Sequence, residues 1–197
     1  MSGDLDRRAS VAALLGDRGN LLVVSGLGGT TWDVAAAGDD DRTFPLWGAM
    51  GGAVSLGLGL ALSRPDDRVL VITGDGEALM GLGSLATVGR QQPANLSVAV
   101  VDNERYGETG MQATHTAEMG AAGSTDLAAV ALACGWQAAW TVRHADDLVD
   151  TARRLRTLAG PVMAVLKVSP ESPPLIMPPR DGAHLKERFR RALLGRA

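Results

Sequence analysis

Residues 69–112, VLVITGDGEALMGLGSLATVGRQQPANLSVAVVDNERYGETGMQ, form the stretch that decides the fold. Residues 69–73 are a short apolar run rich in β-branched side chains, which is typical of a strand buried on both faces. This run ends at Gly74-Asp75-Gly76. A second run of the same kind, residues 97–101, ends at Asp102-Asn103.

A helix is predicted over residues 77–89, so the stretch reads as strand, helix, strand with the two strands parallel. Both strand ends then meet at the carboxyl edge of the sheet, where open α/β sheets bind ligands. We therefore expect Asp75 and Asn103 to lie side by side. A carboxylate and an amide oxygen in this position suit a magnesium ion that holds a diphosphate. Gly74 is expected to permit a sharp turn, and Gly76 to let phosphate approach the amides that open the helix.

Gly74-Asp75-Gly76, followed after residues 77–102 by Asn103, resembles the signature of thiamine diphosphate enzymes, in which GDG is followed at a comparable spacing by NN. Asp102 stands where that signature has its first Asn, which is not a metal-ligand position. The resemblance implies three Mg²⁺ ligands, namely the side chains of Asp75 and Asn103 and the main-chain carbonyl of Arg105.

Gly48-Ala49-Met50-Gly51 resembles the G-x-M-G segment of the same enzymes, in which the bulky residue wedges between the two cofactor rings and keeps them bent. This implies a catalytic role for Met50, although the residues alone would make it a core side chain. Glu108 is a second catalytic candidate. The predicted cofactor-binding residues are Gly48, Met50, Gly51, Gly74, Asp75, Gly76, Glu77, Ala78, Asn103, Arg105, Tyr106, Gly107, Glu108 and Thr109.

Among these residues Glu77 is expected to contribute its amide, as are Gly76 and Ala78. A carboxylate in the first turn of a helix suits the helix dipole, but it would repel the phosphates if it pointed inward. The Glu77 side chain is therefore expected to point away from the site.

A wider match extends the resemblance. GDGEALMGLGSLATVG and NLSVAVVDNERYGETGMQAT look like segments of the diphosphate-binding (beta) subunit of sulfopyruvate decarboxylases and of the matching half of phosphonopyruvate decarboxylases. This implies a diphosphate-binding subunit of a thiamine diphosphate- and Mg²⁺-dependent 2-oxo acid decarboxylase. Such enzymes also need a glutamate from a separate pyrimidine-binding domain, and the chain carries only the diphosphate-binding half. A pyrimidine-binding partner subunit of similar size, in a hetero-oligomer, is therefore expected.

Two alternative interpretations stay open. The chain could be a subunit of a thiamine diphosphate-dependent carboligase similar to acetolactate synthase, which passes the same intermediate to a second carbonyl compound. It could also be a non-catalytic cofactor-binding subunit, or a domain that self-associates through residues 50–62.

Length and composition indicate one globular domain of 197 residues, in which residues 170–197 form an extended arm and a terminal helix. The net charge of −3 gives no support for nucleic acid binding, which usually requires a basic face. A single cysteine, Cys134, excludes an internal disulfide and a cysteine-bound iron–sulfur cluster.

No membrane attachment or export is expected. Residues 1–8 are charged and no apolar core follows them, so the sequence indicates a cytoplasmic protein. Residues 44–62 carry no charge, but five glycines and a proline make them a weak candidate for a membrane span.

Residues 26–31, GLGGTT, invite comparison with a dinucleotide-binding loop. That loop needs a third glycine where Thr31 stands and a helix directly afterwards, and neither is convincing, so a turn at the rim of the pocket is expected instead. The predicted helix over residues 50–62 carries Gly51, Ser55 and Gly59 in a stripe. The stripe fits either close contact with another subunit or packing on the domain's own sheet.

The loop over residues 104–117 is too long for a simple turn, and such loops at a ligand edge are usually functional. Substrate could meet Tyr106, Glu108, Thr109, Gln112 or His115. Further strands are predicted at 21–25, 136–142 and 161–168, and further helices at 5–15, 127–134, 146–158 and 184–194. The fold class is therefore α/β, with a doubly wound, mostly parallel sheet and helices on both faces.

Overall fold

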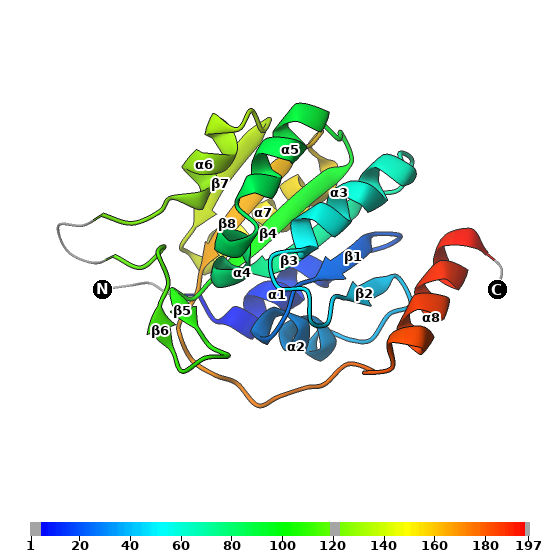
Figure 1. Ribbon diagram of the computed structural model, residues 1–197, viewed down its shortest axis with the longest axis horizontal. Coiled ribbons are helices and arrows are strands. Elements are labelled where there is room, and N and C mark those ends of the chain that lie inside the picture. Colours follow the sequence, from blue (N-terminus) through cyan, green and yellow to red (C-terminus); the bar gives the residue numbers. More distant parts are fainter. Residues whose placement is uncertain (1–4, 119–122, 196–197) are drawn as a thin grey trace.

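Figure 1 shows the computed structural model, which describes residues 5–118 and 123–195. Its centre is a six-stranded sheet in the order β2-β1-β3-β4-β8-β7, and every pairing is parallel. The prediction of a parallel α/β sheet is thus confirmed. The strands are β1 (Leu22–Ser25), β2 (Thr43–Pro45), β3 (Val69–Gly74), β4 (Leu96–Asp102), β7 (Ala138–Val142) and β8 (Val162–Lys167).

Helices cover both faces of the sheet, each burying its apolar side chains against the strands (Figure 1). One face carries α3 (Ala53–Ser63), α5 (Gly83–Gln91) and α6 (Leu127–Ala133). The opposite face carries α1 (Arg7–Leu15), α2 (Gly29–Ala36) and α7 (Leu148–Thr157). Asp126 caps α6 as its position predicts, since its carboxylate accepts a hydrogen bond of 3.0 Å from the Ala129 amide.

The single helix predicted over residues 77–89 is in fact two, α4 (Asp75–Met80) and α5, with a break at Gly81 and Leu82. A tertiary contact accounts for the break. A Cβ atom at Gly81 would lie 2.2 Å from the carbonyl oxygen of Gly51, so the backbone of the 48–52 loop sits directly against the end of α4. The short strand β2 is a further element that the sequence pattern did not predict.

Residues 44–62, the weak membrane candidate, are divided among β2, a turn and the 11-residue helix α3. Among the residues that the structure describes, none of the helices has the length and apolar character needed to cross a bilayer. Residues 1–4, half of the charged segment 1–8, lie outside the described ranges.

Only part of the predicted stripe lies on α3 and faces outward, because Gly51 precedes the helix and packs against the end of α4. Ser55 and Gly59 are exposed, and a Cβ atom at Gly59 would meet nothing within 4 Å. Gly57 is the glycine that packs on the sheet, because a Cβ atom there would lie 2.2 Å from a methyl carbon of Val71. Packing on the domain's own sheet therefore does not explain the stripe.

After β8 the chain runs without regular structure through residues 169–181 and ends in α8 (Gly182–Leu194), which lies beside β2 (Figure 1). The rings of Phe189 and Phe44 are 5.4 Å apart. Arg188 contacts Asp39 at 2.6 Å, so the acidic run at residues 39–41 serves as an anchor for α8 in the same chain.

Candidate functional site

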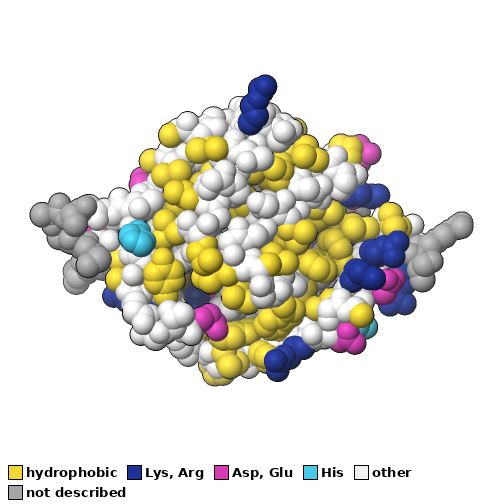
Figure 2. Space-filling model, in the orientation of Figure 1, with side chains coloured by type: hydrophobic (Ala, Val, Ile, Leu, Met, Phe, Trp, Pro, Cys, Tyr) yellow, Lys and Arg dark blue, Asp and Glu magenta, His cyan; other side chains and the backbone are white. Residues whose placement is uncertain are grey.

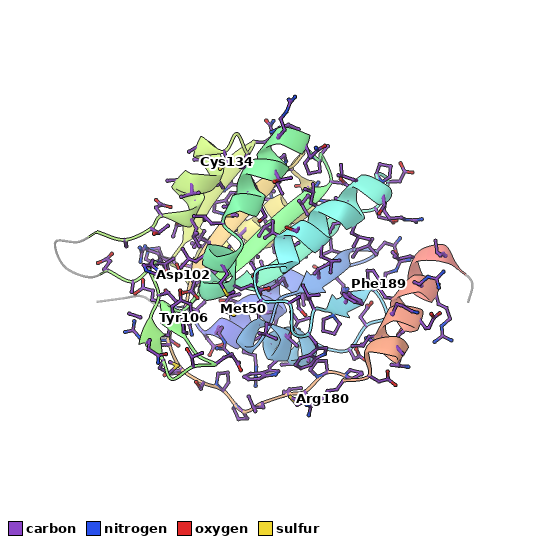
Figure 3. All side chains as sticks on the ribbon, in the orientation of Figure 1. Met50, Asp102, Tyr106, Cys134, Arg180 and Phe189 are labelled. Carbon is purple, nitrogen blue, oxygen red and sulfur yellow. The ribbon has the colours of Figure 1, made fainter. Side chains whose placement is uncertain are left out.

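A cavity of about 260 Å³ opens at the carboxyl edge of the sheet. Gly74 at the end of β3 pairs with Val101 of β4, so the residues that follow the two strands are neighbours. Asp75 and Asn103 both line this cavity, as do Met50 and Tyr106, which are labelled in Figure 3. The predicted cofactor residues that line it are Met50, Gly74, Asp75, Gly76, Glu77, Asn103, Arg105, Tyr106, Gly107, Glu108 and Thr109, whereas Gly48, Gly51 and Ala78 do not.

Asp75 is the first residue of α4 and is only 2% exposed. Its Oδ2 accepts hydrogen bonds from the hydroxyl groups of Thr114 at 2.6 Å and Thr116 at 3.2 Å. Burial, and then the charge of Asp102, raises the pKa of Asp75 to about 6, although the two threonine hydrogen bonds act in the opposite direction. A divalent cation beside this carboxylate would favour its ionised form.

Asp102, the departure from the NN signature, is also buried, and Lys167 neutralises it at 2.8 Å. Lys167 is 2.8 Å from Glu104 as well. Burial alone would lower the pKa of Lys167, but the hydrogen bonds and charges of Asp102 and Glu104 outweigh it, so the pKa is raised. The hydroxyl group of Thr116 lies 2.7 Å from Asp102 Oδ1 and thereby links Asp102 to Asp75.

The turn after β4 is built on two side chains that accept backbone hydrogen bonds. Asp102 Oδ1 accepts from the amide of Glu104, and Asn103 Oδ1 accepts from the amide of Arg105, each at 3.1 Å. Glu104 has a φ of +60°, in the left-handed region that rarely suits a side chain. The chain thus reverses tightly beside Asn103, which keeps Asn103 and Arg105 at the cavity.

Gly74 does not form the expected sharp turn, and the space beside Gly76 is taken by a side chain. Gly74 has a φ of −87° and lies in extended backbone, so the strand runs into α4 without a conformation that requires glycine. A Cβ atom at Gly76 would lie 2.6 Å from the ring of Tyr106. Gly76 therefore leaves room for Tyr106, which closes that side of the α4 backbone.

Glu77 does not point away from the site. Its side chain is buried, and its Oε2 accepts hydrogen bonds from the Leu27 amide at 3.1 Å and the Thr73 hydroxyl group at 2.8 Å. Burial raises the pKa of Glu77, while the Thr73 hydroxyl group and the nearby amides of Leu27, Gly51 and Ala53 act in the opposite direction. Through these two hydrogen bonds Glu77 joins the β1–α2 loop to β3.

The loop after Asn103 folds into a small hairpin of β5 (Arg105–Tyr106) and β6 (Gln112–Ala113). At its tip Glu108 lies against Gly28, where a Cβ atom would be 2.6 Å from a Glu108 carboxylate oxygen. Gln112 and His115 are exposed and do not line the cavity. Gln112 instead holds the hairpin through a 2.9 Å contact with the Thr109 hydroxyl group.

The β1–α2 loop forms a further wall of the cavity. Helix α2 begins directly after it at Gly29, which corrects the expectation that no helix would follow these glycines. Gly28 has a φ of +72°, which suits glycine, and no side chain caps α2. Leu27, Gly28, Gly29, Thr30 and Trp32 line the cavity.

Other lining residues come from segments that no motif identifies. They are Arg7 from the start of α1, Val101 from β4, Met111 from the hairpin, and Ser172, Pro173 and Leu175 from the segment after β8. Thr114 and Thr116, which hold Asp75, were also not predicted. The threonine-rich stretch 109–116 was the one sequence signal that could have indicated them.

Comparison with known proteins gives a family match. The model of the thiamine pyrophosphate enzyme C-terminal TPP-binding domain matches residues 32–168. The chain is 36% identical over 191 residues to the sulfopyruvate decarboxylase subunit beta of Methanothermobacter thermautotrophicus, with 97% of each chain covered. It is 40% identical over 169 residues to the phosphonopyruvate decarboxylase of Streptomyces viridochromogenes, covering 85% of this chain and 41% of the relative.

Solved structures show the same fold. A putative thiamin diphosphate-dependent enzyme from Mycobacterium smegmatis aligns with a TM-score of 0.70 and 20% identity, covering 85% of this chain and 32% of the other. Benzoylformate decarboxylase from Polynucleobacter necessarius aligns with a TM-score of 0.68 and 19% identity, covering 87% and 34%. The chain therefore spans about a third of each of these structures.

Proposed function

Because the chain belongs to the thiamine pyrophosphate enzyme family, through its C-terminal TPP-binding domain, we propose that it is the diphosphate-binding subunit of a 2-oxo acid decarboxylase that uses thiamine diphosphate and Mg²⁺. The substrate class is that of sulfopyruvate or phosphonopyruvate. One observation carries the proposal. Asp75 and Asn103, which follow two neighbouring parallel strands, line a single cavity together with Met50.

The donor set at this cavity fits Mg²⁺ bound to a diphosphate. Magnesium prefers oxygen ligands and is usually held by one or two protein side chains together with phosphate and water. Asp75 would supply a carboxylate oxygen, Asn103 an amide oxygen and Arg105 its main-chain carbonyl. Thr114 and Thr116 fix the Asp75 carboxylate by hydrogen bonds, so its free oxygen is held in place for the cation.

Met50 would hold the cofactor in its bent form. It lies in the loop between Gly48 and Gly51, which have φ values of +73° and +89°. The close contact of Gly51 with Gly81 fixes this loop against α4. The cofactor, when bound, would supply the electron sink for loss of carbon dioxide. The protein's part is to position it and to keep water away.

The active enzyme would contain a second subunit. The Methanothermobacter relative is named a subunit beta and matches this chain over nearly its whole length, whereas the phosphonopyruvate decarboxylases are more than twice as long. We attribute to the partner the pyrimidine-binding half and the glutamate that contacts the pyrimidine ring. A partner of similar size would complete the cofactor site between the chains.

The outer face of α3 is the surface best suited to that partner. Figure 2 shows hydrophobic side chains spread over this part of the molecule. Leu56 and Leu62 are exposed there, and a groove of about 360 Å³ lies between α3 and α8. The exposed stripe of Ser55 and Gly59 would let another backbone approach closely.

Co-purification followed by an activity assay tests the proposal. The tagged full chain is isolated from its native source, and carbon dioxide release from sulfopyruvate and phosphonopyruvate is followed with added thiamine diphosphate and Mg²⁺. Activity is expected from the complex, and it should be lost on treatment with EDTA and restored by Mg²⁺. The chain alone should be inactive. Robust turnover by the chain alone would show that no partner is required. A condensation product formed in place of the free aldehyde, with one carbon dioxide released for each product molecule, would favour the carboligase alternative.

A further inference from the structure

Arg7, the first residue of α1, lines the cavity from a helix that packs against α2. It lines the cavity with Gly28, Gly29 and Asp75, and its side chain is 11% exposed. A Cβ atom at Gly29 would lie 2.9 Å from Arg7 Nη1. Glycine at this position therefore lets a guanidinium group sit directly against the backbone that opens α2. Arg7 also lies outside residues 32–168, the segment that the family match covers.

The guanidinium group of Arg7 is paired with a carboxylate through only two of its three nitrogen atoms. Arg7 Nε lies 2.6 Å from Asp33 Oδ2, and Arg7 Nη2 donates to Asp33 Oδ1 at 3.4 Å. Arg8 also approaches Asp33 Oδ1, at 3.5 Å, so two cations share one fully buried carboxylate. Nη1 of Arg7 makes no hydrogen bond to any residue within 5–118 or 123–195. Arg7 therefore keeps one charged N–H group, Nη1, available to a ligand in a cavity that the carboxylates of Asp75, Glu77 and Glu108 also line.

The backbone beside Arg7 is also suited to an anion. Helix α2 has no side-chain cap and no acidic residue in its first turn. The amides of Thr31 and Trp32 donate to the Gly28 carbonyl, whereas those of Gly29 and Thr30, which line the cavity, have no acceptor among the described residues. The carboxylate of Glu108, on the exposed hairpin tip, lies next to Gly28 at the start of this turn. A negatively charged group therefore already rests where a ligand's phosphate would bind.

The dimensions suit a diphosphate that bridges two parts of the site. Asp75 follows β3, and the β1–α2 loop follows β1, which is the neighbouring strand. Neighbouring strands are about 4.8 Å apart. An anion with two linked phosphates can therefore bind a cation at Asp75 with one end and reach the start of α2 with the other.

We propose that Arg7 Nη1 binds the terminal phosphate of the diphosphate at the start of α2. This inference rests on the proposed function. It assigns to α1 a direct share in cofactor binding. We assign Arg8 a structural role only. It contacts the same Asp33, its Nη2 donates a hydrogen bond of 2.8 Å to the carbonyl of Pro174, and it does not line the cavity.

The test compares thiamine diphosphate with thiamine monophosphate, which lacks the terminal phosphate. Both are titrated calorimetrically, with Mg²⁺, onto the full chain in complex with the subunit that co-purifies with it, or onto the full chain alone if none does. Arg7→Gln should raise the dissociation constant for thiamine diphosphate about tenfold or more, because a charge-assisted hydrogen bond is lost. Binding of the monophosphate should change less than about threefold. Arg7→Lys should recover part of the loss.

Arg8→Gln is the matched control, because it removes the other arginine at Asp33 and should leave both dissociation constants within about threefold of the wild type. If Arg7→Gln does not fold, the double variant Arg7→Gln/Asp33→Asn replaces both charged members of the Arg7–Asp33 pair by neutral side chains. It should show the same loss of affinity for thiamine diphosphate but not for the monophosphate. Thermal unfolding of each variant separates a binding effect from a folding effect.

Three results would overturn the inference while leaving the proposed function intact. These are equal effects of Arg7→Gln and Arg8→Gln, equal weakening of diphosphate and monophosphate, and an unchanged cofactor affinity with a raised KM for the 2-oxo acid. A wild-type complex that binds neither compound in the presence of Mg²⁺ would refute the proposed function itself, and the inference with it.

Discussion

The ammonium group of Lys167 lies 2.8 Å from a carboxylate oxygen of Asp102, and this pair replaces the neutral asparagine of the NN signature. Lys167 is the last residue of β8, and β8 is the strand next to β4. The extra negative charge near Asp75 is therefore neutralised from a neighbouring strand end, and Asp102 is accommodated without a change at Asp75 or Asn103, the two side chains proposed as metal ligands.

Lys167→Met should lower the free energy of unfolding by about 3 kcal/mol, because it leaves the buried Asp102 carboxylate without its cation. The double variant Asp102→Asn/Lys167→Met should recover most of this loss. Arg153→Met is the control, because Arg153 and Asp150 form an exposed pair whose loss should cost less than about 1 kcal/mol. Urea unfolding measures all three. Equal costs for Lys167→Met and Arg153→Met would contradict the neutralising role.

The stabilisation by Lys167 should persist far into the alkaline range. The pKa of Lys167 is raised in the folded protein, so its contribution is complete below the unfolded value of about 10.4 and is lost as the pH rises through the folded value. The difference in unfolding free energy between wild type and Lys167→Met should therefore stay constant from about pH 8 to pH 10. Urea unfolding at several pH values checks it, and a decline that begins below pH 9 would show that Lys167 is not held by Asp102 and Glu104.

The sequence predicted those features that depend on local pattern. The apolar runs that became β3 and β4 and the residues at their ends, Asp75 and Asn103, needed no tertiary information. The break between α4 and α5 could not be predicted, because it depends on the contact of Gly81 with Gly51. The same holds for Lys167, Arg7 and the inward Glu77 carboxylate, since each meets its partners only once distant segments have packed together.

Glu77→Ala should be less stable than Glu77→Gln by about 2 kcal/mol. Both remove the buried charge, but alanine leaves the Leu27 amide and the Thr73 hydroxyl group without an acceptor, whereas glutamine keeps one oxygen for them. Hydrogen exchange should also show faster opening of the β1–α2 loop in Glu77→Ala, because the Leu27 amide loses its acceptor. Exposed Glu187 provides the control, since Glu187→Ala should leave both readouts unchanged. Identical stabilities of the two Glu77 variants would refute the role of this carboxylate as a link between the β1–α2 loop and β3.

Two glycines of α3 should respond in opposite ways to the same substitution. Gly57→Ala should cost about 1 to 3 kcal/mol, because the new methyl group collides with Val71 in the core. Gly59→Ala should stabilise the isolated chain by about 0.5 to 1 kcal/mol, since its surroundings are open and alanine favours the helix. Thermal unfolding of the two variants measures this contrast.

The same helix tests the partner surface. Gly59→Trp adds a large side chain to the exposed stripe, where nothing lies within 4 Å of a Cβ atom. The isolated chain should unfold at a temperature close to that of the wild type, but co-purification of the partner subunit should fall sharply. Leu132→Trp on α6, an exposed position on another helix, serves as the control. Undiminished co-purification with Gly59→Trp would exclude the outer face of α3 as the subunit contact.

Asp75→Ala should abolish Mg²⁺-dependent binding of thiamine diphosphate, because it removes the one carboxylate proposed as a ligand. Asp75→Asn is the sharper variant, since it preserves the shape of the side chain and can still accept hydrogen bonds from Thr114 and Thr116. We expect a loss of affinity of at least about a hundredfold for Asp75→Asn, measured by calorimetry with the complex, and an unfolding temperature close to that of the wild type. Removing the negative charge weakens the Coulomb attraction for a divalent cation, and salt screens this attraction little at the short distance of a ligand. An affinity equal to that of the wild type would place the cation elsewhere, and the proximity of Asp75 to Asn103 would then need another explanation.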